Sequence, residues 1–284
     1  MRSVYCRETR QLQQGKQYGE KYLCFLYNNI CGRLLLKIIV SPIFSKINGA
    51  YNNSFLSKRK IPKFIKKYNI NMEEYEKKEY TSFNDFFIRK MINPNVNTIR
   101  TSFISPADSK LLVYNINKNL IINVKNTNYS LKELINEEYH FDDYIGGNCL
   151  VFRLSMEDYH RYCFVDNGSI KKSKYIKGKL HTVSSISSKD RVYVQNCRQW
   201  SVLQTENFEE IICIEVGALL VGKIHNKKVK TYIKGEEKGY FELGGSTIII
   251  LTKNNIRLDT DIQENSKKGI EPMVNYGERI GELR

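Results

Sequence analysis

Two glycines stand directly before a serine and a threonine late in the chain, in the string Gly244-Gly245-Ser246-Thr247. Apolar residues flank this string, so one interpretation is a plain hairpin turn in which glycine supplies positive φ. The other interpretation is chemical, because a glycine carbonyl has no Cβ beside it and is open to attack by the Ser246 hydroxyl. Attack would give an ester, elimination would leave dehydroalanine at 246, and hydrolysis would leave a pyruvoyl group and ammonia. A strained turn, which stores about 1–3 kcal/mol, would favour this rearrangement.

A serine hydroxyl is a poor nucleophile near neutral pH until a base takes its proton. Three further segments combine turn formers with useful side chains. Asp108 lies in a proline-started turn before an apolar run, His160 follows another apolar run, and Gly217 and Gly222 interrupt a third. A histidine has an ordinary pKa of about 6.5 and is suited to act as the base, while a carboxylate can fix its tautomer. Each segment alone is a weak signal.

The elements expected around these residues change character near residue 100. Apolar residues at spacings of three and four, with basic residues between them, predict one amphipathic helix from Tyr22 to about Val40, ending before Ser41-Pro42. Residues 72–92 are also expected to be helical. Short β-like runs follow from about residue 103, at 111–114, 120–124, 149–154, 211–216 and 247–251. The predicted fold class is α+β, with a helical, basic N-terminal region followed by a β-rich catalytic domain.

Positive charge is concentrated at the start of the chain. The whole sequence carries a net charge of +15, and residues 1–70 hold 14 basic residues against two acids. This concentration predicts an anionic partner, either nucleic acid or an acidic membrane surface. A helix packed on its own domain with a solvated basic face is the alternative. Asn, Arg, Lys and Pro interrupt the apolar stretch, so it is not a strong transmembrane candidate.

The cysteines and histidines indicate neither disulfides nor a metal site. Seven scattered cysteines form no CxxC pair, which is typical of reduced thiols in a cytoplasmic compartment. Four histidines lie far apart without the ligand spacing of a zinc site. The sequence therefore predicts no metal.

Taken in order, these segments resemble the phosphatidylserine decarboxylase family. The resemblance covers about residues 80–284 and rests on Phe-Phe-x-Arg at 86–89, Ser-Pro-Ala-Asp at 105–108, Asp-Tyr-His-Arg at 158–161, Val-Gly-Ala-x-x-Val-Gly at 216–222, Gly-Glu-Glu-x-Gly-x-Phe at 235–241 and Gly-Ser-Thr at 245–247. It implies that Asp108, a histidine and Ser246 drive self-cleavage between Gly245 and Ser246. The products would be a β chain, 1–245, and an α chain, 246–284, whose first residue is a covalent pyruvoyl group derived from Ser246.

By the same resemblance, the pyruvoyl group forms a Schiff base with phosphatidylserine, CO₂ leaves, and phosphatidylethanolamine is released without a metal or external cofactor. Residues 1–70 would then be a membrane-associating region and residues 71–284 the decarboxylase domain. We expect peripheral attachment to the anionic cytoplasmic face of the cell membrane, compatible with a homodimer and without nucleic acid as partner. The alternatives are a pyruvoyl-dependent decarboxylase of a soluble amino acid, and an inactive family member that binds membranes or nucleic acid.

The sequence departs from the family pattern at the second histidine of Tyr-His-Arg-x-His, where it has Cys163. The base is then expected to be His160, with His181 as a possible helper from a neighbouring loop. Cys163 itself would need a strongly lowered pKa to serve. Ser109 replaces a common glycine, and Gly244 replaces a frequent leucine or valine, which should make the cleavage turn more flexible.

Overall fold

A computed structural model describes residues 2–15, 19–124, 127–182, 191–219, 223–244 and 246–284. The strands are β1 (Arg2–Cys6), β2 (Gln11–Gly15), β3 (Ser102–Ile104), β4 (Ser109–Asn115), β5 (Ile121–Val124), β6 (Thr127–Ser130), β7 (Asn148–Leu154), β8 (Arg161–Cys163), β9 (Gly168–Ile176), β10 (Arg198–Thr205), β11 (Glu210–Val216), β12 (Ile224–Asn226), β13 (Thr231–Tyr232), β14 (Glu237–Phe241), β15 (Ser246–Thr252), β16 (Ile256–Leu258), β17 (Glu271–Val274) and β18 (Arg279–Leu283).

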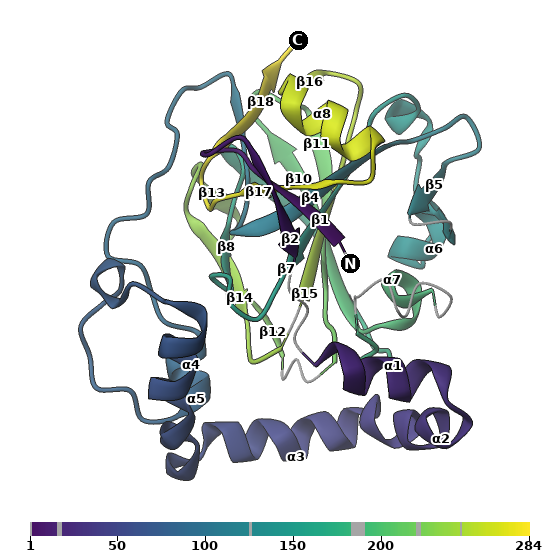
Figure 1. The fold of residues 1–284 in the computed structure, drawn as a ribbon. Helices are drawn as coiled ribbons and strands as arrows, with labels where there is room; N and C mark the ends of the chain where they lie inside the picture. Colours follow the sequence, from purple (N-terminus) through teal and green to yellow (C-terminus); the bar gives the residue numbers. More distant parts are fainter. Residues whose placement is uncertain (1, 16–18, 125–126, 183–190, 220–222, 245) are drawn as a thin grey trace.

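The helices are α1 (Glu20–Asn28), α2 (Ile30–Ile39), α3 (Pro42–Asn53), α4 (Ile61–Tyr68), α5 (Phe83–Phe87), α6 (Leu131–Ile135), α7 (Val192–Gln195) and α8 (Thr260–Lys267), with 3₁₀ turns η1 (Phe55–Lys60), η2 (Met72–Glu74) and η3 (Asp142–Tyr144). Helices dominate from α1 to α5, and strands dominate from β3 onward (Figure 1). The predicted α+β class, with a helical N-terminal region and a larger β-rich part, is therefore confirmed.

The β-rich part is built around one large sheet. Its described strands lie in the order β13-β9-β10-β11-β15-β7-β4-β17-β1-β2, and two three-stranded sheets, β12-β14-β8 and β16-β18-β3, lie beside it. Every residue of β15 is buried, between β11 and β7. This burial explains why β15 has a continuous apolar run instead of alternation. All five β-like runs predicted from the sequence are strands.

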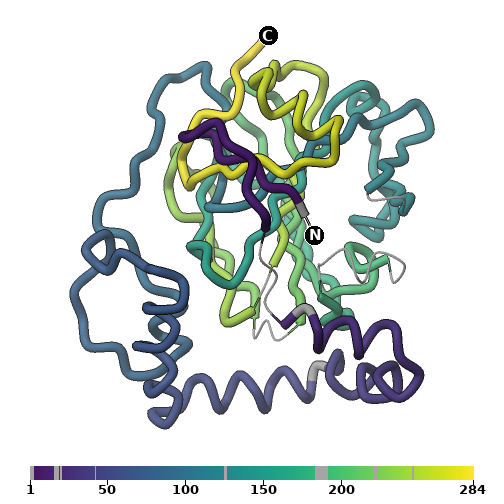
Figure 2. Tube along the Cα trace, in the orientation of Figure 1, coloured from purple at the N-terminus to yellow at the C-terminus, as the bar shows by residue number. Residues whose placement is uncertain are grey.

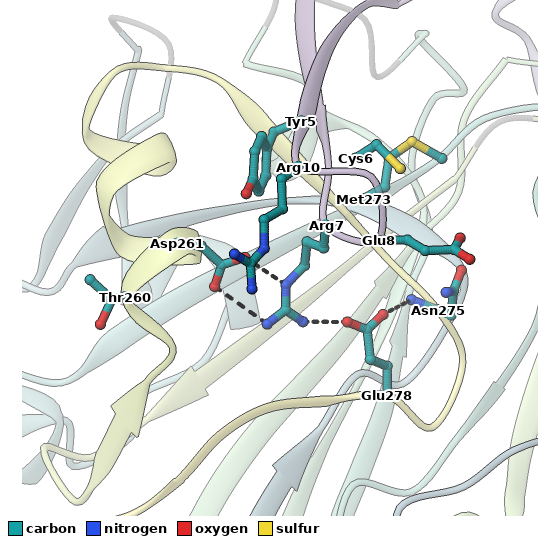
Figure 3. Close-up of a pocket in the computed structure, with 10 residues that line it drawn as sticks. All are labelled: Tyr5, Cys6, Arg7, Glu8, Arg10, Thr260, Asp261, Met273, Asn275 and Glu278. Carbon is teal, nitrogen blue, oxygen red and sulfur yellow. Dashed lines mark hydrogen bonds and ion pairs between the residues drawn. The ribbon is translucent and has the colours of Figure 1, made fainter.

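The chain starts with a β-hairpin, and the helical region begins only at residue 20. β1 pairs in parallel with β17, and β2 forms an edge of the large sheet. Arg7, in the turn after β1, forms ion pairs with Asp259, Asp261 and Glu278; Figure 3 shows it between the last two. A surface cavity of about 830 Å³ lies beside these pairs, and none of the residues proposed for chemistry lines it. The hairpin thus ties the start of the chain to residues after 246.

The single helix predicted from Tyr22 to Val40 is wrong, because the chain breaks at Asn29. The backbone of Asn29 is extended (φ −106°, ψ 143°), and its side chain accepts hydrogen bonds from Cys31 N and Gly32 N. These bonds satisfy free N–H groups of α2, so Asn29 starts a new helix at 102° to α1. Among the described helices none is long and apolar enough to cross a membrane alone; α1 and α2 meet that criterion only as a bent pair.

The helix predicted over residues 72–92 is also wrong for most of its length. Only η2 and the short α5 are helical there, and Ser82 caps α5 by accepting a hydrogen bond from Asp85 N. Phe83, Phe86 and Phe87 of α5 are buried against α4 and its surroundings. Aromatic packing, which local periodicity does not encode, therefore organises this segment.

The helices from α1 to α5 wrap around one end of the β-rich part (Figures 1 and 2). In the view of Figure 1, α1, α2 and α3 run beneath the strand ends, and α4 and α5 lie to the left. Leu219, which follows β11, packs with α1 and α2 residues such as Leu36. Leu243, which follows β14, packs with Phe83 and Phe87 of α5. The helical layer therefore contacts the chain on both sides of the β15 start.

Candidate active site

Three neighbouring strands bring the predicted groups to one end of the large sheet. Ser246 is the first residue of β15 and pairs with Leu154, the last residue of β7. Lys110 of β4 pairs with Arg153 of β7, so Asp108, just before β4, leaves the sheet at the same end. Because both strand pairs are antiparallel, the start of β15, the end of β7 and the start of β4 coincide. Residues far apart in the sequence are thus gathered at one edge.

The Gly244–Ser246 connection is not a hairpin turn. β14 belongs to a three-stranded sheet and β15 to the large sheet, so the chain crosses from one sheet to the other. Gly244 has φ 137°, which residues with a Cβ rarely adopt, so glycine is required by conformation here. Leu243 N donates to the Asn84 side chain at 3.1 Å and anchors the connection on α5. Gly245 lies outside the described residues.

The Ser246 side chain is fully buried, and its Oγ has no hydrogen-bond partner among the described residues. Burying a hydroxyl without a partner costs free energy, so buried hydroxyls are normally paired. Thr247 and Thr252 of β15 also have buried hydroxyls without a partner among the described residues, so this feature alone does not distinguish Ser246. What distinguishes Ser246 is its position at the start of β15, directly after the connection in which Gly244 has φ 137°.

His160 joins the two segments that flank this connection. Its backbone carbonyl accepts a hydrogen bond from Phe241 N, at the end of β14, at 3.0 Å. Its ring Nε2 lies 2.9 Å from the carbonyl of Ser155, the residue after the strand partner of Ser246. Because a carbonyl oxygen only accepts, this bond places the ring proton on Nε2 and the lone pair on Nδ1. Nδ1 has no partner in the described part of the chain.

The surroundings of His160 keep its ring neutral. Phe87 lies against it, with ring centroids 4.3 Å apart, and both residues are fully buried. The pKa of His160 is lowered to about 3, chiefly by burial; the bond to Ser155 opposes this shift, and the positive charge of Arg89 contributes to it. A neutral imidazole with a free nitrogen can accept a proton, which is what activation of a serine hydroxyl requires.

A buried ion pair fixes the loop between β7 and His160. Lys110 Nζ lies 2.6 Å from Asp158 Oδ1 and 3.2 Å from Glu157 Oε1. Asp158 Oδ2 in turn accepts a hydrogen bond from Ser155 N at 2.6 Å. Because the Ser155 carbonyl is bonded to the His160 ring, the contacts that fix Ser155 also help to orient that ring.

Asp108 lies at the same sheet end but does not hydrogen bond His160 in the described part of the chain. Its Oδ1 accepts a hydrogen bond from Tyr276 N at 2.7 Å. The pKa of Asp108 is raised to about 6, chiefly by burial; the Tyr276 bond opposes this shift, and the nearby Asp158 charge contributes to it. Asp108 therefore links the β chain region to residues after 246, and its charge is lost on mild acidification.

The thiol that replaces the second family histidine is unsuited to act as a base. Cys163 is fully buried, and its Sγ lies 3.8 Å from Ser105 O. Burial raises the pKa of Cys163 to about 12, the opposite direction from the one that a basic thiolate needs. At neutral pH the thiol keeps its proton.

His181 lies on the other flank of β15, toward β11. Val216 of β11 pairs with Thr247 of β15. Asn196 connects this strand end to His181, because its Nδ2 donates to the carbonyl of Gly217 at 2.7 Å and to that of His181 at 2.8 Å. His181 Nδ1 lies 3.2 Å from the Tyr27 hydroxyl of α1. Gly222, the second glycine of the predicted motif here, lies outside the described residues.

Several residues of this region carried no recognisable signal in the sequence. Phe87 contacts His160, Tyr276 contacts Asp108, and Asn84 anchors Leu243 before the cleavage connection, yet an isolated Asn or Tyr could not be distinguished from a structural residue. Only Phe87 belonged to a motif, the Phe-Phe-x-Arg run, and that motif suggested no role for it. Burial and long-range contacts reveal these residues, and neither is visible in local spacing.

Comparison with known proteins identifies the family of the chain. The family model described as phosphatidylserine decarboxylase matches residues 83–282. The chain is 52% identical over 285 residues to phosphatidylserine decarboxylase proenzyme 2 of Clostridium acetobutylicum, covering 99% of this chain and 98% of that protein. It is 42% identical to phosphatidylserine decarboxylase proenzyme of Clostridium tetani, covering 99% and 98%, and 38% identical to that of Clostridium botulinum Alaska E43, covering 99% of each. The chain therefore belongs to the phosphatidylserine decarboxylase family.

Proposed function

We propose that this chain is a proenzyme that cuts itself between Gly245 and Ser246 and then converts phosphatidylserine to phosphatidylethanolamine and CO₂. One observation carries the assignment of the residues. Ser246 begins β15 with a buried hydroxyl that has no partner among the described residues, and His160 connects the end of β14 to Ser155, beside the strand partner of Ser246. Family membership supports the reaction, and this geometry supports the place of the cut.

In the cleavage step His160 Nδ1 takes the Ser246 proton, and Oγ attacks the Gly245 carbonyl. The C–N bond breaks as the new C–O bond forms, which leaves an ester with Ser246 N as a free amine. Loss of the Ser246 α-proton then expels the carboxylate of Gly245, and water replaces the amine at the resulting double bond, releasing ammonia. Asp108 stabilises the positive charge that His160 carries transiently, acting across the sheet end instead of through a direct bond.

The residues present fit a pyruvoyl group at position 246. The site is dry: Ser246, His160 and Phe87 are all fully buried. The group supplies an electron sink for the electrons released with CO₂. Phe87 and Leu243 exclude water, and His160 moves a proton at Nδ1. Because its pKa is low, the protonated form of His160 gives that proton up readily.

Intact mass of the purified protein tests the proposal. Wild type should give two chains, 1–245 and 246–284, the second with a pyruvoyl terminus, whereas Ser246→Ala should stay whole. Thr247→Ala is the matched control, because Thr247 is also fully buried with an unpaired hydroxyl, yet it should be cut normally. A single uncut wild-type chain that decarboxylates phosphatidylserine would refute the proposal.

We also propose that the helices α1 to α3 rest on an anionic membrane surface, peripherally and from the cytoplasmic side. Large apolar side chains stand exposed on these helices, among basic residues: Tyr22, Phe25, Ile30, Leu34, Leu35, Ile38, Ile43, Ile47 and Tyr51. Such a patch is larger than the scattered apolar residues of an ordinary surface. Exposed Lys21, Arg33, Lys37 and Lys46 would add attraction to acidic headgroups at about 1 kcal/mol each.

Flotation with phosphatidylserine vesicles tests this surface. Ile30→Glu together with Ile38→Glu should reduce bound protein at least about tenfold, since both side chains lose their apolar contact and add negative charge. Ile233→Glu is the control, because Ile233 is equally exposed but lies in the β-rich part. Equal loss in both variants, or no loss in either, would show that the helical patch is not the docking face.

A further inference from the structure

Arg89, the last residue of the Phe-Phe-x-Arg run, is a buried cation that has no anionic partner among the described residues. Its side chain is 1% exposed, and its Nε and Nη1 have no hydrogen-bond partner among the described residues. Its Nη2 lies 3.5 Å from the Tyr75 hydroxyl, the outer limit of a hydrogen bond. A buried charge is normally paired, because leaving water is costly unless its donors are satisfied.

Aromatic packing does not remove this deficit. The guanidinium carbon lies 4.5 Å from the centre of the Tyr75 ring and 5.2 Å from that of Phe86. These contacts cover the faces of the guanidinium, whereas its N–H donors point from its edge. Arg198 offers a comparison within the same chain, since it is 2% exposed and all three of its nitrogens donate to backbone carbonyls. Arg89 has no such set of carbonyl acceptors among the described residues.

Arg89 lies beside the residues that hold the reaction centre. Its carbonyl accepts a hydrogen bond from Arg161 Nε at 3.2 Å, and Arg161 follows His160 directly. The ring of Tyr75, which covers Arg89, also contacts Tyr159, with centroids 6.0 Å apart. The positive charge of Arg89 lowers the pKa of His160. An anion held by Arg89 would therefore sit next to the catalytic ring.

We propose that Arg89 binds the phosphodiester of the lipid headgroup through its edge donors, which no described residue accepts from, and so positions the serine moiety at residue 246. A guanidinium matches two phosphate oxygens with two parallel hydrogen bonds. The weak Tyr75 contact is the one that the anion replaces. This inference rests on the proposed function for the identity of the lipid and for the reaction at residue 246.

The headgroup also carries a carboxylate, but that group is the poorer ligand for Arg89. Decarboxylation removes the carboxylate charge, so a buried cation against it would stabilise the reactant more than the transition state and slow the reaction. The phosphodiester keeps its charge throughout. Binding it gives affinity and position without opposing the loss of CO₂.

Calorimetry on the mature enzyme, shown by mass to be cut, separates the two anions. Glycerophosphoglycerol is a phosphodiester without amine or carboxylate, and O-methylserine has both of those groups but no phosphate. Arg89→Lys and Arg89→Met should weaken glycerophosphoglycerol binding, by about 10-fold for Lys and about 100-fold for Met, through loss of charge-assisted hydrogen bonds. O-Methylserine binding should change by less than about threefold.

Arg198→Lys is the matched control, because it alters a buried guanidinium whose donors are already used; it should lower stability and leave glycerophosphoglycerol affinity unchanged. If the Arg89 variants lose O-methylserine binding instead, the cation serves the carboxylate and the proposal is wrong. If these variants do not fold, the wild-type enzyme still tests the proposal. It must bind glycerophosphoglycerol saturably, and a wild-type enzyme that shows no such binding overturns the proposal. An uncut wild-type chain would instead signal failure of the self-cleavage itself.

Discussion

The two flanks of β15 each present a buried histidine, and they hold it in opposite ways. On the β7 flank, His160 donates a hydrogen bond from Nε2 to the Ser155 carbonyl, and its Nδ1 has no partner among the described residues. On the β11 flank, the Tyr27 hydroxyl accepts a hydrogen bond from Thr182 N at 3.1 Å and lies 3.2 Å from His181 Nδ1. Nδ1 of His181 is therefore engaged by the Tyr27 hydroxyl, whichever of the two supplies the proton.

The difference separates a base from a structural ring. A general base needs an available lone pair within reach of the proton that it removes. On the β7 flank Nδ1 of His160 has no partner among the described residues, although it does not hydrogen bond Ser246 Oγ in this structure. On the β11 flank Nδ1 of His181 is engaged by Tyr27 of helix α1. His160 is therefore the better candidate for the base, and His181 for a link between the helical layer and the sheet.

The largest expected effect comes from removing the free nitrogen of the β7 flank. His160→Ala should slow self-cleavage by about 10²–10⁴-fold, the usual contribution of a positioned base. His160→Asn keeps a donor for Ser155 O and should fold while staying equally uncut. The ratio of whole to cut chain by mass spectrometry, followed after cell-free synthesis, measures both.

His181→Ala should slow the cut by less than about tenfold under the same conditions, because Nδ1 of His181 is already engaged by the Tyr27 hydroxyl. His140→Ala is the matched control, since that histidine is exposed and should have no effect. If His181→Ala stays whole while His160→Ala is cut, the roles of the two flanks are reversed.

A pH profile sharpens the comparison further. The pKa of Asp108 is raised to about 6, so its stabilising charge is lost as pH falls through that value, while His160, with a pKa of about 3, stays neutral. The cleavage rate should be level above about pH 7 and fall up to about tenfold per unit below pH 6. Cell-free synthesis followed by transfer to buffers of pH 5 to 8 gives the profile.

In Asp108→Asn the rate should be low and nearly independent of pH across this range. A wild-type profile centred near pH 3 would instead assign the dependence to His160. A profile centred near the ordinary histidine value, and kept in Asp108→Asn, would point to a different base.

The sequence located the strands of this site but not their pairing. The strands at 149–154 and 247–251 were predictable because a strand that is buried on both faces is a continuous run of apolar residues. That β14 and β15 belong to different sheets was not, and the hairpin interpretation of Gly244-Gly245 fails for that reason. The two glycines did indicate a sharp connection. Which sheet the chain enters after it depends on strand pairing between distant segments, which local sequence does not show.

The helical region shows the same limit. Spacing predicted the apolar face of residues 22–40, and the end before Ser41-Pro42 is confirmed. The break at Asn29 was hidden, because one capping side chain outweighs the helical preference of its neighbours. Asp108 and His160 came from the family motifs and stay predictions. The bond from Asp108 to Tyr276 and the unpaired donors of Arg89 required the three-dimensional structure.

The smallest expected effect lies at the contact between α1 and the β11 flank. Tyr27→Phe removes the hydroxyl that touches His181 and accepts from Thr182 N, and should lower the free energy of unfolding by about 1–2 kcal/mol. Self-cleavage should slow by less than about threefold, because the base on the β7 flank is untouched. Urea unfolding of the uncut Ser246→Ala protein measures the first quantity, and mass spectrometry the second. Tyr22→Phe, on the same helix but 78% exposed, should change neither. A collapse of self-cleavage in Tyr27→Phe would mean that α1 positions a catalytic group through His181, and the division between a basic and a structural histidine would then fail.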